Sequence, residues 1–219
     1  MIERIILKNV LPAVFAGAEN EPPVCDSQVW LRDVTFERGR HYLVEAESGT
    51  GKSSLCSFLY GNRSDYSGSI MFNDSDISRY GIDEWCDVRR HALAILPQEM
   101  RLFPELTAME NIMIKNRLTH HHSVGHIMGM LTALELGHKA DVPAGHLSVG
   151  QQQRVAIVRA LCQPFDFILL DEPVSHLDAR NNAAVAELIL TESVAQGAGI
   201  IATSVGNNIS ITPDKVLML

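Results

Sequence analysis

A glycine-rich stretch that ends in a lysine and two serines has the residue types that bind phosphate. Glycines let backbone N–H groups approach phosphate oxygens, a lysine can reach the β- and γ-phosphates, and a serine hydroxyl can ligate Mg²⁺. Ala46 stands where a first glycine is usual, and an alanine held at positive φ costs on the order of 1 kcal/mol. The stretch therefore predicts a nucleotide phosphate loop in which Ser53 is also a metal ligand. Its predicted nucleotide-binding residues are Ala46, Glu47, Ser48, Gly49, Thr50, Gly51, Lys52, Ser53 and Ser54.

Two carboxylates directly follow an apolar run later in the chain. Asp171 and Glu172 come after Phe165–Leu170, a segment with the composition of a central parallel strand. A carboxylate at the C-terminal edge of such a strand faces the ligand crevice of the sheet. Phosphoryl transfer needs both charge neutralisation and an oriented nucleophile. We therefore predict that Asp171 holds Mg²⁺, directly or through water, and that Glu172 polarises the attacking water.

The elements that must position these groups alternate between strands and helices. A small β element is also indicated at Ser69–Phe72 and in the region before Asp83. This alternation predicts a parallel sheet wrapped by helices. The predicted strands are Ile2–Val10, Val29–Phe36, His41–Ala46, Ala92–Leu96, Phe165–Leu170, Gly199–Thr203 and Val216–Leu219. The predicted helices are Ser53–Tyr60, a helix capped by Ser148 and running to about Leu161, and Asn181–Ala195.

A helical region interrupts this alternation. From Glu105 to about His146 the chain is rich in Met, Leu, Ala and His at helical spacing. The expected fold is therefore α/β: a P-loop NTPase parallel sheet core with an antiparallel β element and a helical subdomain. We expect one domain over residues 1–219, with the helical subdomain inserted at about 99–150.

The segment before the acidic strand end makes the resemblance to one family specific. Leu147–Gln151 resembles the Leu-Ser-Gly-Gly-Gln signature of the ABC (ATP-binding cassette) family. Ser175–Asp178 resembles the family's D-loop, Gln98 matches its Q-loop glutamine, and Leu102–Ile112 is also similar to the family. These motifs occur in the family's order across Val29–Ser204. The helical region and its preceding segment most resemble the lipoprotein-releasing and macrolide-export group.

That resemblance implies a nucleotide-binding domain that works as two subunits packed head to tail around two ATP molecules. The second subunit would be another copy of this chain or a similar cassette. Each ATP would lie between the phosphate loop of one subunit and the signature segment of the other. The residues implied to touch nucleotide in trans are Ser148, Val149, Gly150, Gln151 and Asp178. The implied catalytic residues are Glu172, Gln98 and Ser204, and the implied metal ligands are Ser53, Gln98 and Asp171.

Besides Ala46, two residues depart from the family pattern and one expected residue lacks a clear match. Val149 replaces the first signature glycine, with a modest expected effect. Ser204 stands where the family has its switch histidine; a hydroxyl can donate toward the γ-phosphate, but it is shorter than imidazole and never positively charged near neutral pH. We therefore expect weakened hydrolysis with ATP binding retained. Phe15 is a candidate for stacking on adenine, with a core position as the alternative.

Composition bounds the partners and the location of the protein. The chain has 219 residues, a formal net charge of −8 and no dense basic run, which predicts no nucleic-acid partner. No stretch approaches roughly 18 uncharged apolar residues, so we expect any pore to belong to another chain. The four cysteines are scattered, as in a reduced cytosolic protein. A histidine run, His120–His122, indicates a solvated loop or an adventitious metal site.

Three function classes remain open on the sequence. The first is the ATP-hydrolysing motor subunit of an ABC transporter, cytoplasmic and peripheral on the inner face of the cell membrane, bound to an integral membrane permease subunit. The second is a soluble ABC ATPase in repair, translation or cofactor assembly. The third is a module that dimerises on ATP with impaired hydrolysis, as the departures at Ala46, Val149 and Ser204 suggest.

Overall fold

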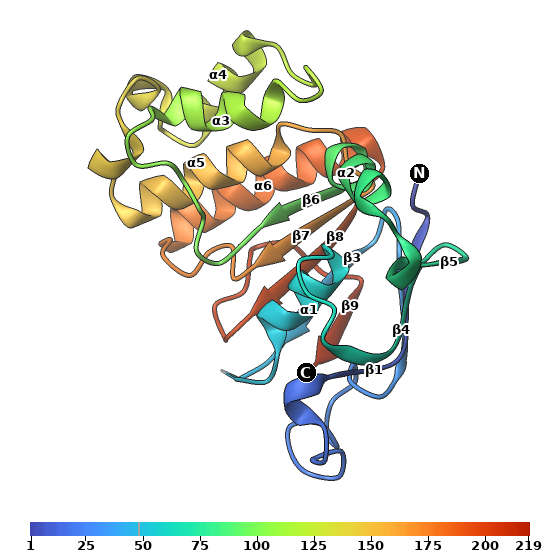
Figure 1. Cartoon of the computed structure of the whole chain (residues 1–219). Helices are drawn as coiled ribbons and strands as arrows, with labels where there is room; N and C mark the ends of the chain where they lie inside the picture. Colours follow the sequence, from blue (N-terminus) through green and yellow to red (C-terminus); the bar gives the residue numbers. More distant parts are fainter. Residues whose placement is uncertain (48) are drawn as a thin grey trace.

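A five-stranded parallel sheet forms the centre of the molecule. The structure, a computed structural model, describes residues 1–47 and 49–219. The strand order is β6-β7-β8-β3-β9, and every neighbouring pair is parallel (Figure 1). Such an order places the C-terminal ends of all five strands at one edge of the sheet, where ligands bind in open α/β folds. The strands are β3 (His41–Glu45), β6 (Leu93–Leu96), β7 (Phe167–Asp171), β8 (Gly199–Ser204) and β9 (Lys215–Met218).

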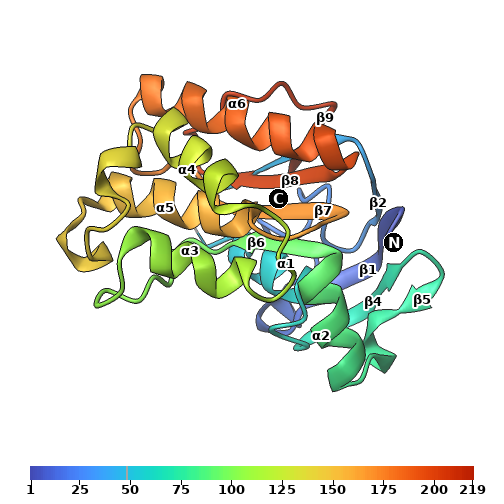
Figure 2. The same ribbon diagram turned by 90° about the horizontal axis from the view of Figure 1, so that it is seen from above.

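A second, antiparallel sheet packs beside the first and confirms the predicted β element. Its order is β2-β1-β4-β5, with β1 paired to both β2 and β4. Figure 2 shows these strands on the side of the molecule away from α4 and α6. The strands are β1 (Arg4–Pro12), β2 (Asp33–Glu37), β4 (Tyr66–Phe72) and β5 (Ser75–Asp76).

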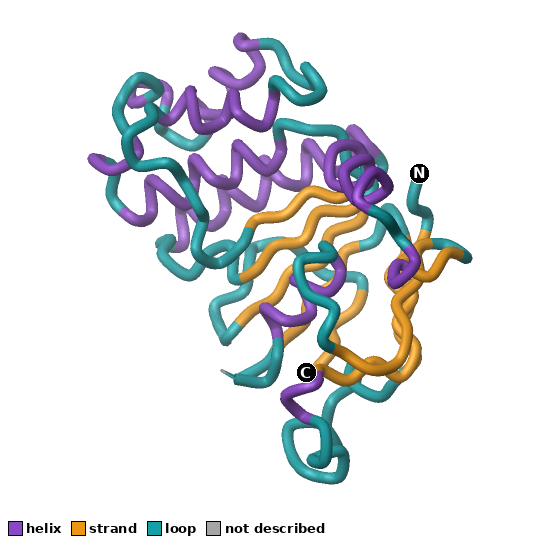
Figure 3. The backbone as a smooth tube through the Cα atoms, in the orientation of Figure 1, coloured by secondary structure: helices purple, strands orange, loops and turns teal. Residues whose placement is uncertain are grey.

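Helices cover both faces of the parallel sheet (Figure 3). Across the part of the chain that the structure describes, none of them has the length and apolar character that a membrane crossing requires. The α-helices are α1 (Lys52–Leu59), α2 (Ile82–His91), α3 (Ala108–Asn116), α4 (Val124–Ala133), α5 (Val149–Leu161) and α6 (Ala179–Gln196). Short 3₁₀ helices are η1 (Ala13–Phe15), η2 (Ile77–Arg79), η3 (Gly137–Lys139) and η4 (Ala144–His146).

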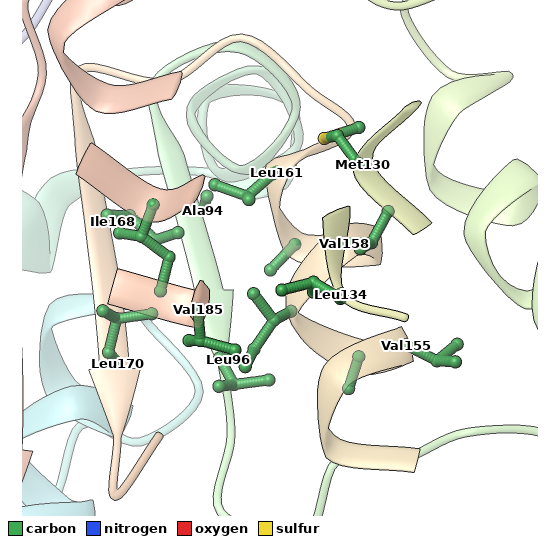
Figure 4. Packing of buried hydrophobic residues seen from close by; sticks show 14 of the residues in the cluster. Ala94, Leu96, Met130, Leu134, Val155, Val158, Leu161, Ile168, Leu170 and Val185 are labelled. Carbon is green, nitrogen blue, oxygen red and sulfur yellow. The ribbon is translucent and has the colours of Figure 1, made fainter. Parts of the chain in front are cut away.

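The sheet separates two apolar cores. Side chains alternate along β7, so Ile168 and Leu170 pack against α3–α6, whereas Phe167 and Leu169 pack against α1 and the antiparallel sheet. Burial on both faces explains why this strand is apolar throughout. Figure 4 shows part of the first core, where side chains of α4, α5 and α6 meet those of β6 and β7. The labelled residues are Ala94, Leu96, Met130, Leu134, Val155, Val158, Leu161, Ile168, Leu170 and Val185.

Two segments differ from the sequence-based prediction. The strand predicted at Val29–Phe36 begins only at Asp33, because the N–H groups of Val29 and Trp30 donate to Ser27 Oγ and form a turn instead. The helix α2 lies where the sequence pattern predicts no helix. Glu84 Oε2 accepts the Gly81 N–H at its start, and its Trp85 ring covers Gly61 so closely that a Cβ there would lie 2.5 Å from the ring.

Candidate active site

The phosphate loop joins the end of β3 to the start of α1, as predicted. Gly49 and Gly51 have φ values of 89° and 102°, in the left-handed region that favours glycine. A Cβ on Gly51 would also lie 3.1 Å from the indole ring of Trp30, whose Nε1 donates to the Thr50 carbonyl at 3.0 Å. Both glycines are therefore required by the backbone path. Ser48, predicted to bind nucleotide, lies outside the described residues.

Ala46 is accommodated without the backbone strain that a positive φ would bring. The non-glycine residues at positive φ, within 1–47 and 49–219, do not include Ala46. Its N–H donates to the Ser204 carbonyl at 3.2 Å, so the loop begins as a continuation of the β3–β8 pairing. The strain energy expected for an alanine at positive φ is therefore absent, and alanine at this position leaves the loop geometry intact.

Lys52 brings a buried positive charge to the loop. Its side chain is 5% exposed, and Nζ donates to the carbonyl oxygens of Glu47 at 2.7 Å and Ala46 at 3.4 Å. The same nitrogen lies 3.9 Å from Glu172 Oε1. A buried ammonium needs partners of this kind, because its desolvation is costly. The loop and the acidic strand end are thus in contact through Lys52.

One hydroxyl contacts both acidic residues at the end of β7, the carboxylate of Asp171 and the backbone of Glu172. Thr203, buried on the neighbouring β8, donates from Oγ1 to Asp171 Oδ1 at 2.8 Å. Thr203 Oγ1 also accepts the Glu172 N–H at 3.3 Å. Glu172 has φ 50°, which turns its side chain away from the strand direction. Thr203 was expected only as a strand residue; its position beside Asp171 depends on the pairing of β7 with β8.

Gln98 follows β6 and completes this group. Its Nε2 donates to Glu172 Oε2 at 3.3 Å. Ser53, Gln98 and Asp171, the three predicted metal ligands, line one cavity of about 490 Å³. Their hydroxyl, amide and carboxylate oxygens are the hard donors that Mg²⁺ prefers, so the residues present fit that ion. Burial raises the pKa of the adjoining Cys56 thiol well above its ordinary value, which keeps it un-ionised.

The signature segment forms the exposed N-terminal end of α5. Ser148 is the N-cap, and its Oγ accepts the Gln151 N–H at 3.3 Å while Gln151 Oε1 accepts the Ser148 N–H at 3.0 Å. Val149 is 50% exposed. A Cβ on Gly150 would lie 2.9 Å from the His176 carbonyl oxygen, so this glycine allows α5 to approach the segment after Glu172. The second signature glycine therefore has a packing reason, and the first position tolerates valine.

Gln153 connects the signature helix to the acidic strand end. It is buried, and its Nε2 donates to the Glu172 carbonyl and to Ser175 Oγ, both at 3.3 Å. Its Oε1 accepts the His176 N–H at 3.2 Å. The sequence motif contains Gln153 but gives no signal for this bridging role. Asp178 caps α6, and its bond to the Asn181 N–H lowers the pKa of that carboxyl.

The ABC transporter family model matches residues 32–175. The chain belongs to the ABC transporter family. This membership confirms the predicted family and fold class. It also places the chain among ATP-binding cassettes with ATPase activity.

Curated ABC proteins match most of this cassette. The macrolide export ATP-binding/permease protein MacB of Shewanella sp. (strain W3-18-1) is 33% identical over 195 residues, covering 85% of this chain and 30% of MacB. The cassette thus spans under a third of that relative's length. The lipoprotein-releasing system ATP-binding protein LolD of Xylella fastidiosa is 31% identical over 85% of this chain and 79% of LolD. The ABC transporter ATP-binding protein YtrE of Bacillus subtilis is 33% identical over 79% of this chain and 74% of YtrE.

Solved ABC cassettes share the fold. The dimeric structure of MJ0796, a bacterial ABC transporter cassette, superposes with a TM-score of 0.82 at 22% identity, over 98% of this chain and 94% of that one. A post-hydrolysis dimer of the same cassette, bound to ADP and phosphate, gives a TM-score of 0.79. These structures support the nucleotide-binding fold of the family to which this cassette belongs.

Two site residues of the cassette have informative surroundings. Ser204 ends β8 and is 2% exposed, and among the described residues its Oγ has no hydrogen-bond partner. It follows Thr203, whose side chain faces Asp171, so strand alternation turns Ser204 to the other face of the sheet. Phe15 lies in η1 beside the phosphate loop, 3.4 Å from where a Gly51 Cβ would lie. Phe15 therefore borders the predicted nucleotide site.

The signature and the phosphate loop of one chain are separate. Within residues 1–47 and 49–219, no hydrogen bond, ion pair or cavity joins Ser148 to Lys52. The helices that they begin, α5 and α1, pack in the two different cores on opposite faces of the parallel sheet (Figure 1). The chain thus brings together Lys52, Gln98, Asp171 and Glu172, and leaves the signature segment exposed elsewhere.

Proposed function

We propose that this cassette is the ATP-hydrolysing motor subunit of an ABC transporter and works as a head-to-tail dimer around two ATP molecules. The observation that carries the proposal is the separation of Ser148 from the cavity that Asp171 and Gln98 line. A two-fold dimer places the same two patches against each other twice. Each signature segment would then complete the site of the other subunit.

In each site, backbone N–H groups of the phosphate loop and the Lys52 ammonium bind the β- and γ-phosphates. Lys52 Nζ already donates to loop carbonyls, so binding phosphate exchanges these acceptors for more highly charged ones. Ser53, Gln98 and Asp171 would hold Mg²⁺, which would supply neutralisation of the charge that develops on the phosphates. Thr203 keeps Asp171 Oδ1 pointed in a fixed direction through its 2.8 Å hydrogen bond.

Glu172 is the proposed general base. Its carboxylate accepts a proton from the attacking water, and Gln98 Nε2 and Lys52 Nζ hold its two oxygens in place. Gln153 fixes the backbone of Glu172 from the signature helix of the same chain. A movement of α5 would therefore shift the backbone of Glu172 directly.

The partner subunit supplies the rest of the site. Ser148, Gly150 and Gln151 lie at the positive end of the α5 dipole, which favours an anionic γ-phosphate. Val149 extends the exposed contact surface, and Asp178 sits at the start of α6 to organise the dimer interface.

Slow turnover is a second candidate feature, favoured by Ser204. A buried serine whose Oγ has no hydrogen-bond partner among the described residues does not supply the long, chargeable donor of a switch histidine. The cassette would then bind ATP and dimerise with ordinary affinity but hydrolyse it more slowly than relatives with histidine. Catalysis would rest on Glu172, Gln98 and the groups from the partner.

The names of the relatives support a membrane partner. LolD and YtrE are named as ATP-binding proteins of a releasing system and a transporter, and MacB as an ATP-binding/permease protein. We propose that residues 1–219 form one nucleotide-binding domain, with a helical subdomain at about 99–150, on the cytoplasmic face of the cell membrane against an integral permease subunit. Co-purification with a membrane-spanning protein tests this; recovery with soluble assembly or repair factors alone would contradict it.

Mixing two inactive variants tests the shared sites. Lys52→Ala should weaken ATP binding by about tenfold to a hundredfold, through loss of charged hydrogen bonds. Ser148→Arg should block the signature segment and leave the phosphate loop of its own chain intact. In a mixed dimer, one site combines the intact loop of one variant with the intact signature of the other, so turnover should reappear. Lys8→Ala, an exposed substitution on β1, is the matched control.

Two outcomes contradict the proposal. Near-native ATP affinity in Lys52→Ala would refute the phosphate-loop assignment. Mixed samples that are no more active than either variant alone would refute the head-to-tail arrangement, provided that both variants fold and form mixed dimers.

A further inference from the structure

Two histidines and a glutamate gather on the opposite side of the first core from the nucleotide site. His122 precedes α4, His126 lies in its first turn, and Glu192 lies near the C-terminal end of α6. The ligand atoms that these three side chains offer all lie within 4.8 Å of one another. Helix α4 packs against both α5 and α6, which brings the histidine run to a carboxylate 66 residues away from His126.

The geometry directs all three side chains to one point. His126 Nε2 lies 2.8 Å from Glu192 Oε1, and His122 Nε2 lies 3.3 Å from Glu192 Oε2. The two imidazole rings are stacked, with centroids 4.2 Å apart and an interplanar angle of 20°. Ser123 Oγ accepts the His126 N–H at 3.2 Å and so fixes the start of the helix between the two histidines. Both Nε2 atoms therefore face the same carboxylate.

The Glu192 carboxylate already pairs with His126 Nε2 at 2.8 Å, whereas one buried nitrogen of the cluster has no hydrogen bond among the described residues. The side chains of Glu192 and His122 are 8% and 12% exposed. The Nε2 atom of His122 is buried, and within the described residues it makes no hydrogen bond. Buried polar atoms in native proteins are nearly always satisfied, and a buried carboxylate needs compensating charge. One divalent ion would satisfy the carboxylate and both imidazoles together.

We propose that His122, His126 and Glu192 form a Zn²⁺ site. Two imidazole nitrogens and a carboxylate oxygen are a donor set typical of zinc, whereas Mg²⁺ prefers oxygen ligands alone. Zinc–ligand distances of about 2.0–2.2 Å require only small side-chain movements from the observed spacing. Three protein ligands leave the fourth position to water.

The site would brace α4 against α6. Glu192 lies 14 residues after Asp178 in the chain, which is about 21 Å along α6 at 1.5 Å per residue. Bound zinc is therefore expected to stabilise the packing of α4 without contacting Asp178 at the other end of α6. The burial of His122 disagrees with a solvated histidine loop, the first of the two expectations for this run, and the proposed site develops the second, a metal site.

Zinc titration of chelator-treated, tag-free protein tests the proposal. Isothermal titration calorimetry should give one Zn²⁺ per chain, and saturation at about a hundred times Kd should raise Tm by about 5–10 °C. His126→Gln should weaken zinc binding at least about tenfold and remove the Tm rise. His126 is half-exposed, so this variant should fold, which its Tm in chelator checks. Without ATP, any Tm change caused by Mg²⁺ should be the same in the wild-type protein and in His126→Gln.

His120→Gln is the matched control, because it shortens the histidine run without touching the cluster. It should bind zinc as the wild-type protein does, and Glu192→Gln should bind weakly. Zinc affinity that is unchanged in both His126→Gln and Glu192→Gln would overturn the proposal. So would an equal loss in His120→Gln, which would assign the ion to the exposed run.

Discussion

The phosphate-loop region and the signature region lie in one chain but differ in how completely they are assembled. Lys52 and Asp171 are each 5% exposed, and both have charged or hydrogen-bonded partners within the chain. Ser148 is exposed, and its side chain serves only the N-terminal end of its own helix. Groups within the chain already hold the side chains of the phosphate-loop region in place. The signature region instead exposes its donors at the surface.

This difference has a physical reason. Buried charges must be compensated within the chain, so the catalytic groups are pre-positioned by neighbours such as Thr203. A helix N-terminus at the surface can leave donors to water and exchange them for an anion at little cost. The two regions are nevertheless linked, because Gln153 on α5 bonds the backbone of Glu172. Substitutions in each region should therefore have different effects.

The largest expected effect is on the base. Glu172→Gln should lower the rate of ATP hydrolysis by about 10²- to 10⁴-fold, the contribution of a general base, while ATP still binds. Phosphate release measures the rate, and size-exclusion chromatography with ATP should show a trapped dimer. Glu187→Gln, an exposed substitution on α6, is the control. Unchanged turnover in Glu172→Gln would remove Glu172 from the mechanism.

Removing the Thr203 hydroxyl that bonds the Asp171 carboxylate and the Glu172 N–H should act through Mg²⁺. Thr203→Val leaves Asp171 and the Glu172 N–H without their shared partner. The Mg²⁺ concentration needed for half-maximal ATPase rate should rise by about 10- to 100-fold, as for other groups that orient metal ligands. Thr191→Val, whose hydroxyl bonds only within α6, is the control. A superimposable Mg²⁺ titration would show that Thr203 merely packs.

Restoring a longer donor at the end of β8 tests the slow-turnover proposal. Ser204→His should raise the ATPase rate by about tenfold, because one additional charge-assisted hydrogen bond contributes about 1.5 kcal/mol. ATP affinity should change little. Ser204→Ala is the control and should resemble the wild-type protein. The idea fails if wild-type turnover already equals that of family members with histidine and Ser204→His brings no gain.

The smallest effect concerns stability at the cavity. Burial, helped by the nearby Arg159 and Arg89 guanidinium groups, lowers the pKa of Lys115 from 10.5 to about 8. The folded state therefore releases this proton before the unfolded state does, and the free energy of unfolding should rise between about pH 8 and 10.5. Below about pH 8 the full cost of the buried charge is present.

Lys115→Met should remove that rise and stabilise the fold near neutral pH by on the order of 1 kcal/mol. Urea unfolding at about pH 7 and about pH 10 measures the gain near neutral pH and the loss of the rise. In the folded wild-type protein, Lys115 is mostly charged at the first pH and mostly neutral at the second. Lys139→Met, outside this cavity, is the control. A pH dependence that survives in Lys115→Met would assign it to another group.

Local patterns predict the elements that need apolar residues, glycines or capping residues at fixed positions. The buried run of β7, the positive-φ glycines of the phosphate loop and the Ser148 cap all have signals within a few residues of themselves. Helix α2 also has local signals, because Glu84 Oε2 accepts the Gly81 N–H at its start and basic residues lie in its last turn, but none of its residues is fully buried. The turn at Val29 depends on a hydrogen bond from its N–H to Ser27 Oγ.

The sequence by itself determined the chemistry of this protein: a phosphate loop, an acidic strand end, a signature helix and their order along the chain. Only the tertiary structure decided which side chains serve that chemistry from a distance. Thr203 reaches Asp171 through strand pairing, and Gln153 reaches Glu172 through helix packing. Glu192 of α6 meets His122 and His126, just before and within the first turn of α4, because these two helices pack together. Contacts between residues so far apart in the chain arise from packing, which no local spacing records.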